Sequence, residues 1–225
     1  TFPFSFVALK EIRKPDDLAG KKIGIVGFGG ANELAVVRAL KEWNVPRQSV
    51  TIIQSGGAAN RLVALSAKAL DATVLAYPEL GEAVRMGMNV LAHMRDMKTA
   101  AFPMNVIVVR RSFLEKNRDT VKRFQQAYAE ATHQFLNSRE KALAVLAQRM
   151  QQKNPKAVEE TYQYVAPGFS FPTRVSHQGL RNTLEMVAQR YPGTKVETNL
   201  EKFLDESTLD ELEREGFFKR LAGKS

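Results

Sequence analysis

Short apolar runs alternate with amphipathic stretches through the first half of the chain. The apolar runs are short and rich in β-branched residues, so they predict strands over residues 22–26, 50–54, 73–76, 90–93 and 104–110. The stretches between them carry apolar residues at helical spacing and predict helices over residues 33–43, 60–70 and 79–86. Such alternation predicts an α/β lobe in which helices cover both faces of a parallel sheet.

The pattern changes after Arg111, where strand signals nearly vanish. Amphipathic periods separated by Asn, Pro and Gly predict helices over residues 119–137, 140–152, 155–165 and 176–190. The C-terminal part is therefore expected to be largely helical. At the other end, residues 1–12 are apolar and β-prone but lack an initiator Met and the features of a signal peptide. We expect the start of this sequence to lie within a longer protein.

Composition narrows the classes of function. The 225 residues are 44% hydrophobic, enough for one large domain or two small lobes, and contain no cysteine, which excludes disulfides and thiolate nucleophiles. The formal net charge is +9, but acids interleave with bases, as in Arg139-Glu140-Lys141. This arrangement is typical of solvated helix faces and argues against nucleic acid as a partner. Charged residues also interrupt every long apolar run, so no membrane span is expected.

Metal and catalytic motifs are absent from the sequence pattern. The three histidines, His93, His133 and His177, are far apart, and none has a partner at metal-ligand spacing or within a nucleophile motif. We therefore expect no metal, no cofactor and no catalytic residue.

A glycine-rich turn follows the first predicted strand in residues 24–32, GIVGFGGAN. Glycine lets a ligand approach the backbone, and the free N–H groups at a helix start favour negative charge. The dinucleotide fingerprint is not met, because Asn32 occupies the position of its third glycine and no acid ends the next strand. No Lys-Ser or Lys-Thr pair follows either, as a phosphate-binding P-loop would require. A cradle for a small ligand, a purely structural turn and a nucleotide site remain as the interpretations, in that order of preference.

The next two strands end in comparable polar segments. Residues 54–60, QSGGAAN, join a strand to a helix through small residues, and Tyr77-Pro78 follows the third strand. Parallel strands end at one edge of a sheet, where open α/β folds bind ligands. Tyr77 offers a ring and a hydroxyl for a ligand, although packing of its ring explains it equally well.

Several motifs together resemble one protein family. Residues 12–25, IRKPDDLAGKKIGI, followed by the glycine-rich turn and a helix, resemble the "DL-x-GK-x-IG" signature of type II periplasmic solute-binding proteins. The similarity is greatest to the branch that serves nitrate, sulfonate and thiamine-pyrimidine-precursor ABC transporters. Ala64-Leu65 before Asp71-Ala72, and Phe113 through Phe135, are similar to further family motifs. The resemblance covers nearly the whole chain.

This resemblance implies a type II periplasmic-binding-protein-like fold with three segments. Residues 1–20 would supply a hinge-proximal strand of the first lobe, residues 21–105 the second α/β lobe, and residues 106–225 the return strand and helical remainder of the first lobe. The rest of the first lobe would precede Thr1. The lobes would close on a ligand by a hinge motion.

The resemblance also implies the function, the partners and the site. The protein would not be an enzyme but would bind a small anionic or heterocyclic solute (a sulfonate, nitrate, a carboxylate or a pyrimidine-like molecule) for an ABC transporter permease. It would be periplasmic or otherwise extracytoplasmic, with a lipid anchor as an option in a preceding segment. The expected ligand-binding residues are Gly29, Gly30, Ala31, Asn32, Ser55, Gly56, Gly57, Ala58 and Tyr77.

Two positions depart from the family pattern. Ala31 stands where many relatives have Ser or Thr, which weakens the case for an anion there. Lys68 stands where the family has glycine, so a left-handed helix end at this position would cost about 1 kcal/mol.

Two alternative functions use the same fold. A ligand-sensing domain would regulate a signalling protein instead of serving a transporter. An enzyme of pyrimidine or thiamine precursor metabolism is the other alternative, although the cysteine-rich iron motif of the fungal pyrimidine-precursor synthase has no counterpart in a sequence without cysteine.

Overall fold

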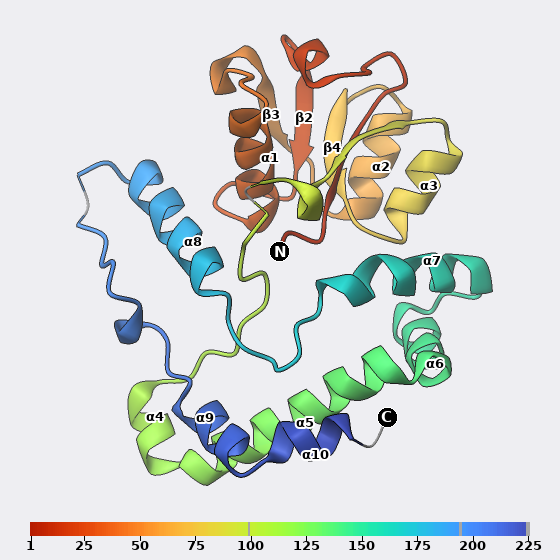
Figure 1. The fold of residues 1–225 in the computed structure, drawn as a ribbon. Coiled ribbons are helices and arrows are strands. Elements are labelled where there is room, and N and C mark those ends of the chain that lie inside the picture. The colour runs from red at the N-terminus through yellow and green to blue at the C-terminus, as the bar shows by residue number, and fades with distance from the viewer. Residues whose placement is uncertain (99, 194, 224–225) are drawn as a thin grey trace. The chain divides into compact units, whose positions relative to one another are not determined.

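The computed structural model describes residues 1–98, 100–193 and 195–223. The chain forms two compact units, Thr1–Met104 and Asn105–Ser225. Figure 1 shows strands and helices in the first unit and helices in the second. The boundary between the units lies shortly before Arg111, after which the sequence pattern becomes helical.

A mixed sheet forms the centre of the first unit. Its strands are β1 (Ser5–Ala8), β2 (Lys22–Ile25), β3 (Thr51–Gln54), β4 (Ala72–Leu75) and β5 (Asn89–His93), in the order β3-β2-β4-β1-β5. Strand β2 pairs in parallel with both β3 and β4, with Gly24 opposite Ile53 on one side and Thr73 on the other. The predicted strands at these positions are confirmed, and β2, β3 and β4 all end at one edge of the sheet.

Three helices cover this sheet: α1 (Ala31–Glu42), α2 (Ala58–Ser66) and α3 (Glu79–Arg85). Crossovers between parallel strands are right-handed, so α1, between β2 and β3, and α2, between β3 and β4, lie on opposite faces. Figure 1 shows α1 on one side of β2 and β4, and α2 and α3 on the other. Phe6, Ile23 and Leu75 are fully buried between these layers.

The resemblance implied that residues 1–20 supply a hinge-proximal strand of a first lobe, apart from the second lobe at residues 21–105. That division into lobes stays a prediction. In the structure, β1 lies between β4 and β5 and pairs antiparallel with both. Its residues are buried throughout, because each face of this central strand is covered. The strand therefore belongs to the same compact unit as β2 to β5.

The strand predicted over residues 104–110 is wrong. These residues form no ladder with any other described part of the chain, and α4 (Arg111–Lys116) follows them directly. The side chain of Val108 is 83% exposed. An apolar, β-branched run satisfies its backbone as a strand only when a neighbouring strand is present.

Helix α2 ends earlier than predicted, at Ser66, and the reason is the departure noted at Lys68. Lys68 has a φ of +57°, the left-handed conformation that glycine adopts at many helix ends. The N–H of Ala69 then returns to the carbonyl of Ala64 at 2.8 Å, which closes the last turn. The strained backbone at Lys68 is thus accompanied by a hydrogen bond that satisfies a carbonyl group at the end of α2.

The second unit consists of helices in its described part. Besides α4, they are α5 (Arg118–Asn137), α6 (Arg139–Met150), α7 (Pro155–Val165), α8 (His177–Arg190), α9 (Ser207–Arg214) and α10 (Phe217–Ala222). The helices predicted from residue 119 to residue 190 are confirmed. Ala129, Leu209, Leu212 and Phe218 form a buried cluster that joins α5, α9 and α10.

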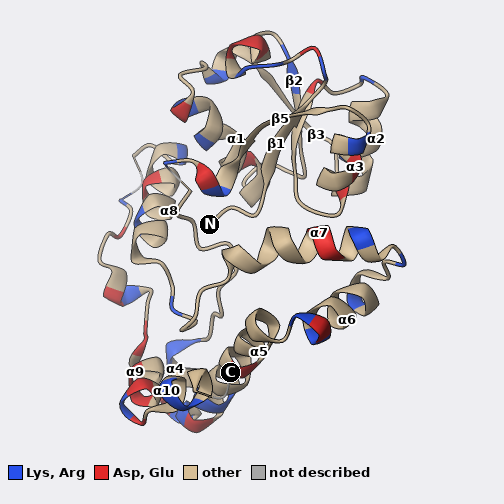
Figure 2. Ribbon diagram, turned by 45° about the vertical axis from the view of Figure 1, so that its right-hand side comes forward, with Lys and Arg blue, Asp and Glu red and all other residues tan. Residues whose placement is uncertain are grey.

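Charged residues cover the outside of this cluster. Both basic and acidic residues occur on α5 and α9, whereas α10 carries only basic ones (Figure 2). Arg118 and Lys122 on α5 pair with Glu211 and Glu215 on α9 and at its end. None of the helices in the described residues is both long enough and apolar enough to cross a membrane.

Candidate functional site

The predicted ligand-binding residues follow the ends of β2, β3 and β4. We call residues 27–30 the first glycine loop and residues 55–57 the second glycine loop. The N–H of Ser55 donates to the carbonyl of Ile25 at 2.8 Å, which continues the pairing of β2 and β3 beyond the strands. A Cβ atom on Gly27 would lie 3.8 Å from the Gln54 side chain. The two loops are therefore neighbours at the carboxyl edge of the sheet.

The first glycine loop leads into helix α1 and is hydrogen-bonded to a carboxylate from the first turn of that helix. Gly29 has a φ of +82°, which favours glycine, and Gly30 is the N-cap residue of α1. The N–H of Gly29 donates to Glu33 Oε2 at 2.6 Å, and Glu33 is only 8% exposed. The helix start that was expected to hold an anion thus already faces a negative side chain of the first turn.

Asn32 and Ala31 form the first turn of α1. Asn32 is 6% exposed, and its Oδ1 is buried without a hydrogen-bond partner among the described residues. An unsatisfied buried carbonyl oxygen costs about 1–3 kcal/mol, so it is an uncommon feature of a folded protein. Ala31, partly buried, provides only its backbone and a methyl group.

Phe28 lies within the first glycine loop and was not selected from the sequence. Its side chain is 54% exposed, and the neighbouring Val26 is 49% exposed. An aromatic ring between glycines, exposed at the edge where parallel strands end, offers a flat apolar surface to a planar solute. Its position between Gly27 and Gly29 in the sequence was the available signal.

The second glycine loop leads into helix α2. Gly56 has a φ of +75°, and a Cβ atom there would lie 3.2 Å from Asn60 Nδ2, so a side chain at this position would be strained. Gly57 has an ordinary φ of −62° and is the N-cap of α2, without a side-chain capping bond. No atom lies within 4 Å of a Cβ built on Gly57. The backbone at Gly57 is thus open to a ligand.

Arg61 lies beneath the second glycine loop and was not among the site residues predicted from the sequence. It is 2% exposed and donates three hydrogen bonds: Nη1 to the carbonyl of Gly56 at 2.5 Å, Nε to Thr73 Oγ1 at 3.0 Å, and Nη2 to the carbonyl of Val74 at 3.1 Å. Burial lowers the pKa of the Arg61 guanidinium, and the charge of Glu79 acts in the opposite direction. Arginine nevertheless stays protonated in proteins.

Tyr77 follows β4 and precedes α3. It is partly buried, and the N–H of Leu80 donates to the carbonyl of Ala76 at 2.9 Å as the helix begins. Because β4 neighbours β2 in the sheet, Tyr77 lies at the same edge as the two glycine loops. The sequence-predicted residues from all three strand ends thus share one edge.

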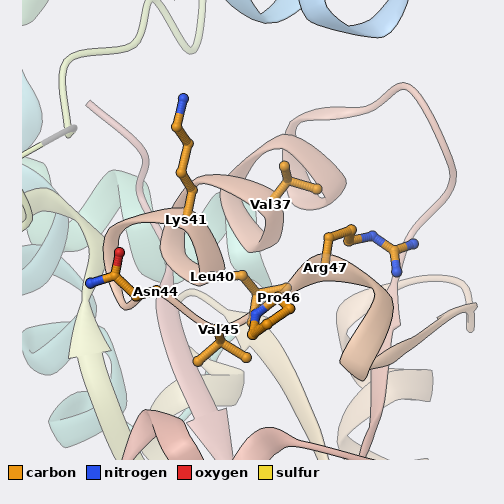
Figure 3. A pocket seen from close by; sticks show the side chains of 7 residues that line it. All are labelled: Val37, Leu40, Lys41, Asn44, Val45, Pro46 and Arg47. Atoms are coloured by element: carbon orange, nitrogen blue, oxygen red, sulfur yellow. The ribbon is translucent and has the colours of Figure 1, made fainter.

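A pocket of about 410 Å³ lies elsewhere on the first unit. It is lined by Val37, Leu40, Lys41, Asn44, Val45, Pro46 and Arg47 (Figure 3). These residues belong to the C-terminal half of α1 and the connection to β3, so the pocket is at the end of α1 opposite the first glycine loop. It contains none of the residues predicted to bind a ligand.

The described residues include all three histidines. Among the described residues, no group of three or more His, Asp or Glu side chains is arranged to hold a metal ion. Ser5 and His93 are joined by a hydrogen bond of 2.7 Å between Oγ and Nδ1, which links β1 to β5.

Comparison with known proteins identifies similar sequences and folds. The family model described as NMT1/THI5 like matches residues 1–142. No curated protein matches the sequence. The alkanesulfonate-binding protein SsuA from Xanthomonas axonopodis pv. citri, bound to MOPS, is 19% identical with a TM-score of 0.68, over 86% of this chain and 67% of that one.

Two further solved structures share the fold. The ligand-binding component of an ABC-type import system from Staphylococcus aureus, with zinc bound, is 15% identical with a TM-score of 0.71, over 93% of this chain and 70% of that one. The desulfurization enzyme DSZB is 13% identical with a TM-score of 0.62, over 94% and 76%. The expected α/β, periplasmic-binding-protein-like fold class is thus confirmed.

Proposed function

Because the chain belongs to the NMT1/THI5-like family, we propose that it is a solute-binding component of an ABC-type importer. In this role it captures a small solute at the carboxyl edge of the first unit's sheet and performs no chemistry on it. A permease is the macromolecular partner, and the protein works outside the cytoplasm. Solved binding proteins with the same fold support this proposal.

One observation carries the proposal: two glycine loops lie side by side after the adjacent parallel strands β2 and β3. The Ser55 to Ile25 hydrogen bond of 2.8 Å holds them together. Gly29, Gly30 and Gly57 are exposed, so the backbone is open to a solute on both loops. Ligands of open α/β sheets bind at such a carboxyl edge.

The two loops differ in the solute groups that they suit. Glu33 gives the first glycine loop a hydrogen-bond acceptor with negative charge, and Phe28 adds an exposed ring. This loop suits the N–H donors and flat face of a heterocycle better than an inorganic anion. The second glycine loop lies at the start of α2, where free N–H groups favour negative charge. It therefore suits an acidic group of the solute. We therefore favour a solute that carries both kinds of group over nitrate alone.

An enzyme on this fold is the second candidate, because the desulfurization enzyme DSZB shares the architecture. Against it, this sequence contains no cysteine for a thiolate nucleophile. A sensing domain would use the same site, so binding experiments test the shared part of both functions.

A thermal unfolding screen tests the proposed function. The panel contains alkanesulfonates, nitrate, carboxylates, aminopyrimidines and nucleotides, and a solute that binds only the folded protein raises the melting temperature by mass action. We expect a rise with a sulfonate, carboxylate or aminopyrimidine, followed by a dissociation constant from calorimetry. A rise with dinucleotides alone would contradict the proposal, as would conversion of the bound solute into another compound.

A further inference from the structure

A buried basic side chain lies beneath the second glycine loop. Arg61 is the fourth residue of α2 and is 2% exposed, whereas Arg and Lys are almost never buried to this extent without a charged partner. Among the described residues, no carboxylate lies within ion-pairing distance of it. Its three acceptors are the hydroxyl of Thr73 and the carbonyls of Gly56 and Val74.

These acceptors come from different elements. Gly56 is in the second glycine loop, while Thr73 and Val74 are in β4. The Thr73 hydroxyl donates in turn to the carbonyl of Gly24 in β2 at 2.8 Å. One guanidinium thus ties the loop to two strands of the sheet, with its five donors held in a rigid fork. The position of the loop depends on it directly.

The guanidinium of Arg61 is hydrogen-bonded only to neutral groups, and Glu79 acts on its charge from beyond ion-pairing distance. A buried charge acts on its surroundings through a medium that screens it less than water does. The Gly56 carbonyl that accepts from Nη1 at 2.5 Å belongs to the loop where the backbone at Gly57 is open. The positive charge of Arg61 would therefore attract an anionic group bound at this loop.

We propose that Arg61 is the positioning residue of the candidate ligand site, fixing the second glycine loop against β4 and giving that loop a preference for anionic solutes. The preference rests on the proposed function, whereas the positioning role does not. The two parts are tested by separate measurements, one without ligand and one with defined probes.

Hydrogen exchange of the ligand-free protein tests the positioning role. In Arg61→Gln, amides of residues 55–60 should exchange about tenfold faster than in the wild type, because their opening costs less free energy. Amides of β1 and β5, which Arg61 does not contact, should keep their rates. Unchanged rates at residues 55–60, or equal acceleration in every strand, would overturn the positioning role. If Arg61→Gln does not fold, Arg61→Lys replaces it, since lysine keeps the charge but cannot make all three bonds.

Calorimetry with ethanesulfonate and its uncharged twin ethanesulfonamide tests the charge preference. The wild type should bind the sulfonate at least tenfold more tightly than the sulfonamide, and Arg61→Gln should lose that ratio while Arg61→Lys retains it. A merely structural role would weaken both probes equally and overturn the preference. Equal affinities of the wild type for the sulfonate and the sulfonamide would also overturn the preference. If the wild type binds neither probe nor any member of the screening panel, the proposed function and the preference both fail, and the exchange experiment still decides the positioning role.

Discussion

The carboxylate of Glu33 accepts the N–H of Gly29 at 2.6 Å, so the first glycine loop is stabilised by a side chain of the helix that it starts. The residue lies in the first turn of α1, where negative charge interacts favourably with the helix dipole. The same interaction that a bound anion would make is thereby already made within the protein. This difference between the two glycine loops has consequences for ligand selectivity that can be measured.

Glu33→Gln should leave the loop in place but remove its charge, because the glutamine oxygen still accepts the Gly29 N–H. We expect the free energy of unfolding to fall by about 0.3–1 kcal/mol through the lost helix-dipole interaction. Affinity for ethanesulfonate should rise about threefold or more, since a nearby negative charge is removed. Glu11→Gln, an equal change of charge on an exposed residue after β1, is the control for long-range electrostatics. Equal affinities in the two variants would contradict an effect of Glu33.

Alanine substitutions at the adjacent residues Gly56 and Gly57 distinguish an effect on backbone strain from an effect on ligand binding. Gly57→Ala should leave the melting temperature unchanged, because φ is −62° and no atom lies within 4 Å of the added Cβ. It should still weaken binding of the solute found in the screen about tenfold, since the new methyl group occupies the space that the ligand needs. Gly168→Ala adds a methyl group to similarly open space in the second unit and should change neither quantity. Full affinity in Gly57→Ala would remove Gly57 from the site.

Gly56→Ala should behave differently from its neighbour. With a φ of +75° and Asn60 Nδ2 at 3.2 Å from the added Cβ, the substitution should lower the free energy of unfolding by about 1–2 kcal/mol. Denaturant unfolding of both glycine variants measures this difference directly. Equal stability of Gly56→Ala and Gly57→Ala would contradict the strained loop conformation.

The sequence predicted the parts of the fold that depend on local signals. Strands β2 to β4 and the glycine loops follow from short apolar runs bounded by small residues, and parallel strands necessarily end at one edge. The position of β1 was not predictable in this way, because its pairing with β4 joins residues that are far apart in the chain. Residues 106–109 show the converse case, in which a strong local strand signal finds no partner among the described residues.

The candidate site shows the same limit at the level of side chains. Glycines at strand ends are recognisable because their conformational freedom is a property of the residue itself. Arg61 resembles any basic residue on a helix until the fold places it against Thr73 and Gly56. Glu33 likewise reads as an ordinary acid of a first helical turn, and only its bond to Gly29 shows that it serves the loop. Burial and partners are tertiary properties, which the residue pattern does not contain.

Lys68 offers a test of the helix end that the sequence marked as unusual. Lys68→Gly should raise the free energy of unfolding by about 1 kcal/mol, because glycine adopts a φ of +57° without the Cβ clash. Lys41→Gly, the same change within α1, should lower it by about the same amount because glycine is a poor helix former. Denaturant unfolding of the two variants should thus give opposite signs. Destabilisation by both would contradict the left-handed conformation at Lys68.

Acid should weaken the connection between α5 and α9 through Glu211. Arg118 donates to the Glu211 carboxylate from Nε at 3.0 Å and from Nη2 at 2.5 Å, and this bond is the main cause that lowers the pKa of Glu211 below its usual value. A carboxyl group whose pKa is lower in the folded state stabilises the fold above its unfolded pKa of about 4.3. That contribution is lost as the pH falls through the lowered value.

Melting temperatures of the wild type and Glu211→Gln between pH 7 and pH 2 measure this contribution. The wild type should be the more stable of the two at neutral pH, and the difference should shrink once the pH drops below about 4. Glu130→Gln, which removes an exposed carboxylate from α5, is the matched control and should follow the wild type at every pH. A difference between the wild type and Glu211→Gln that stays constant down to pH 2 would show that Glu211 acts by packing, because protonation would then leave its contribution unchanged.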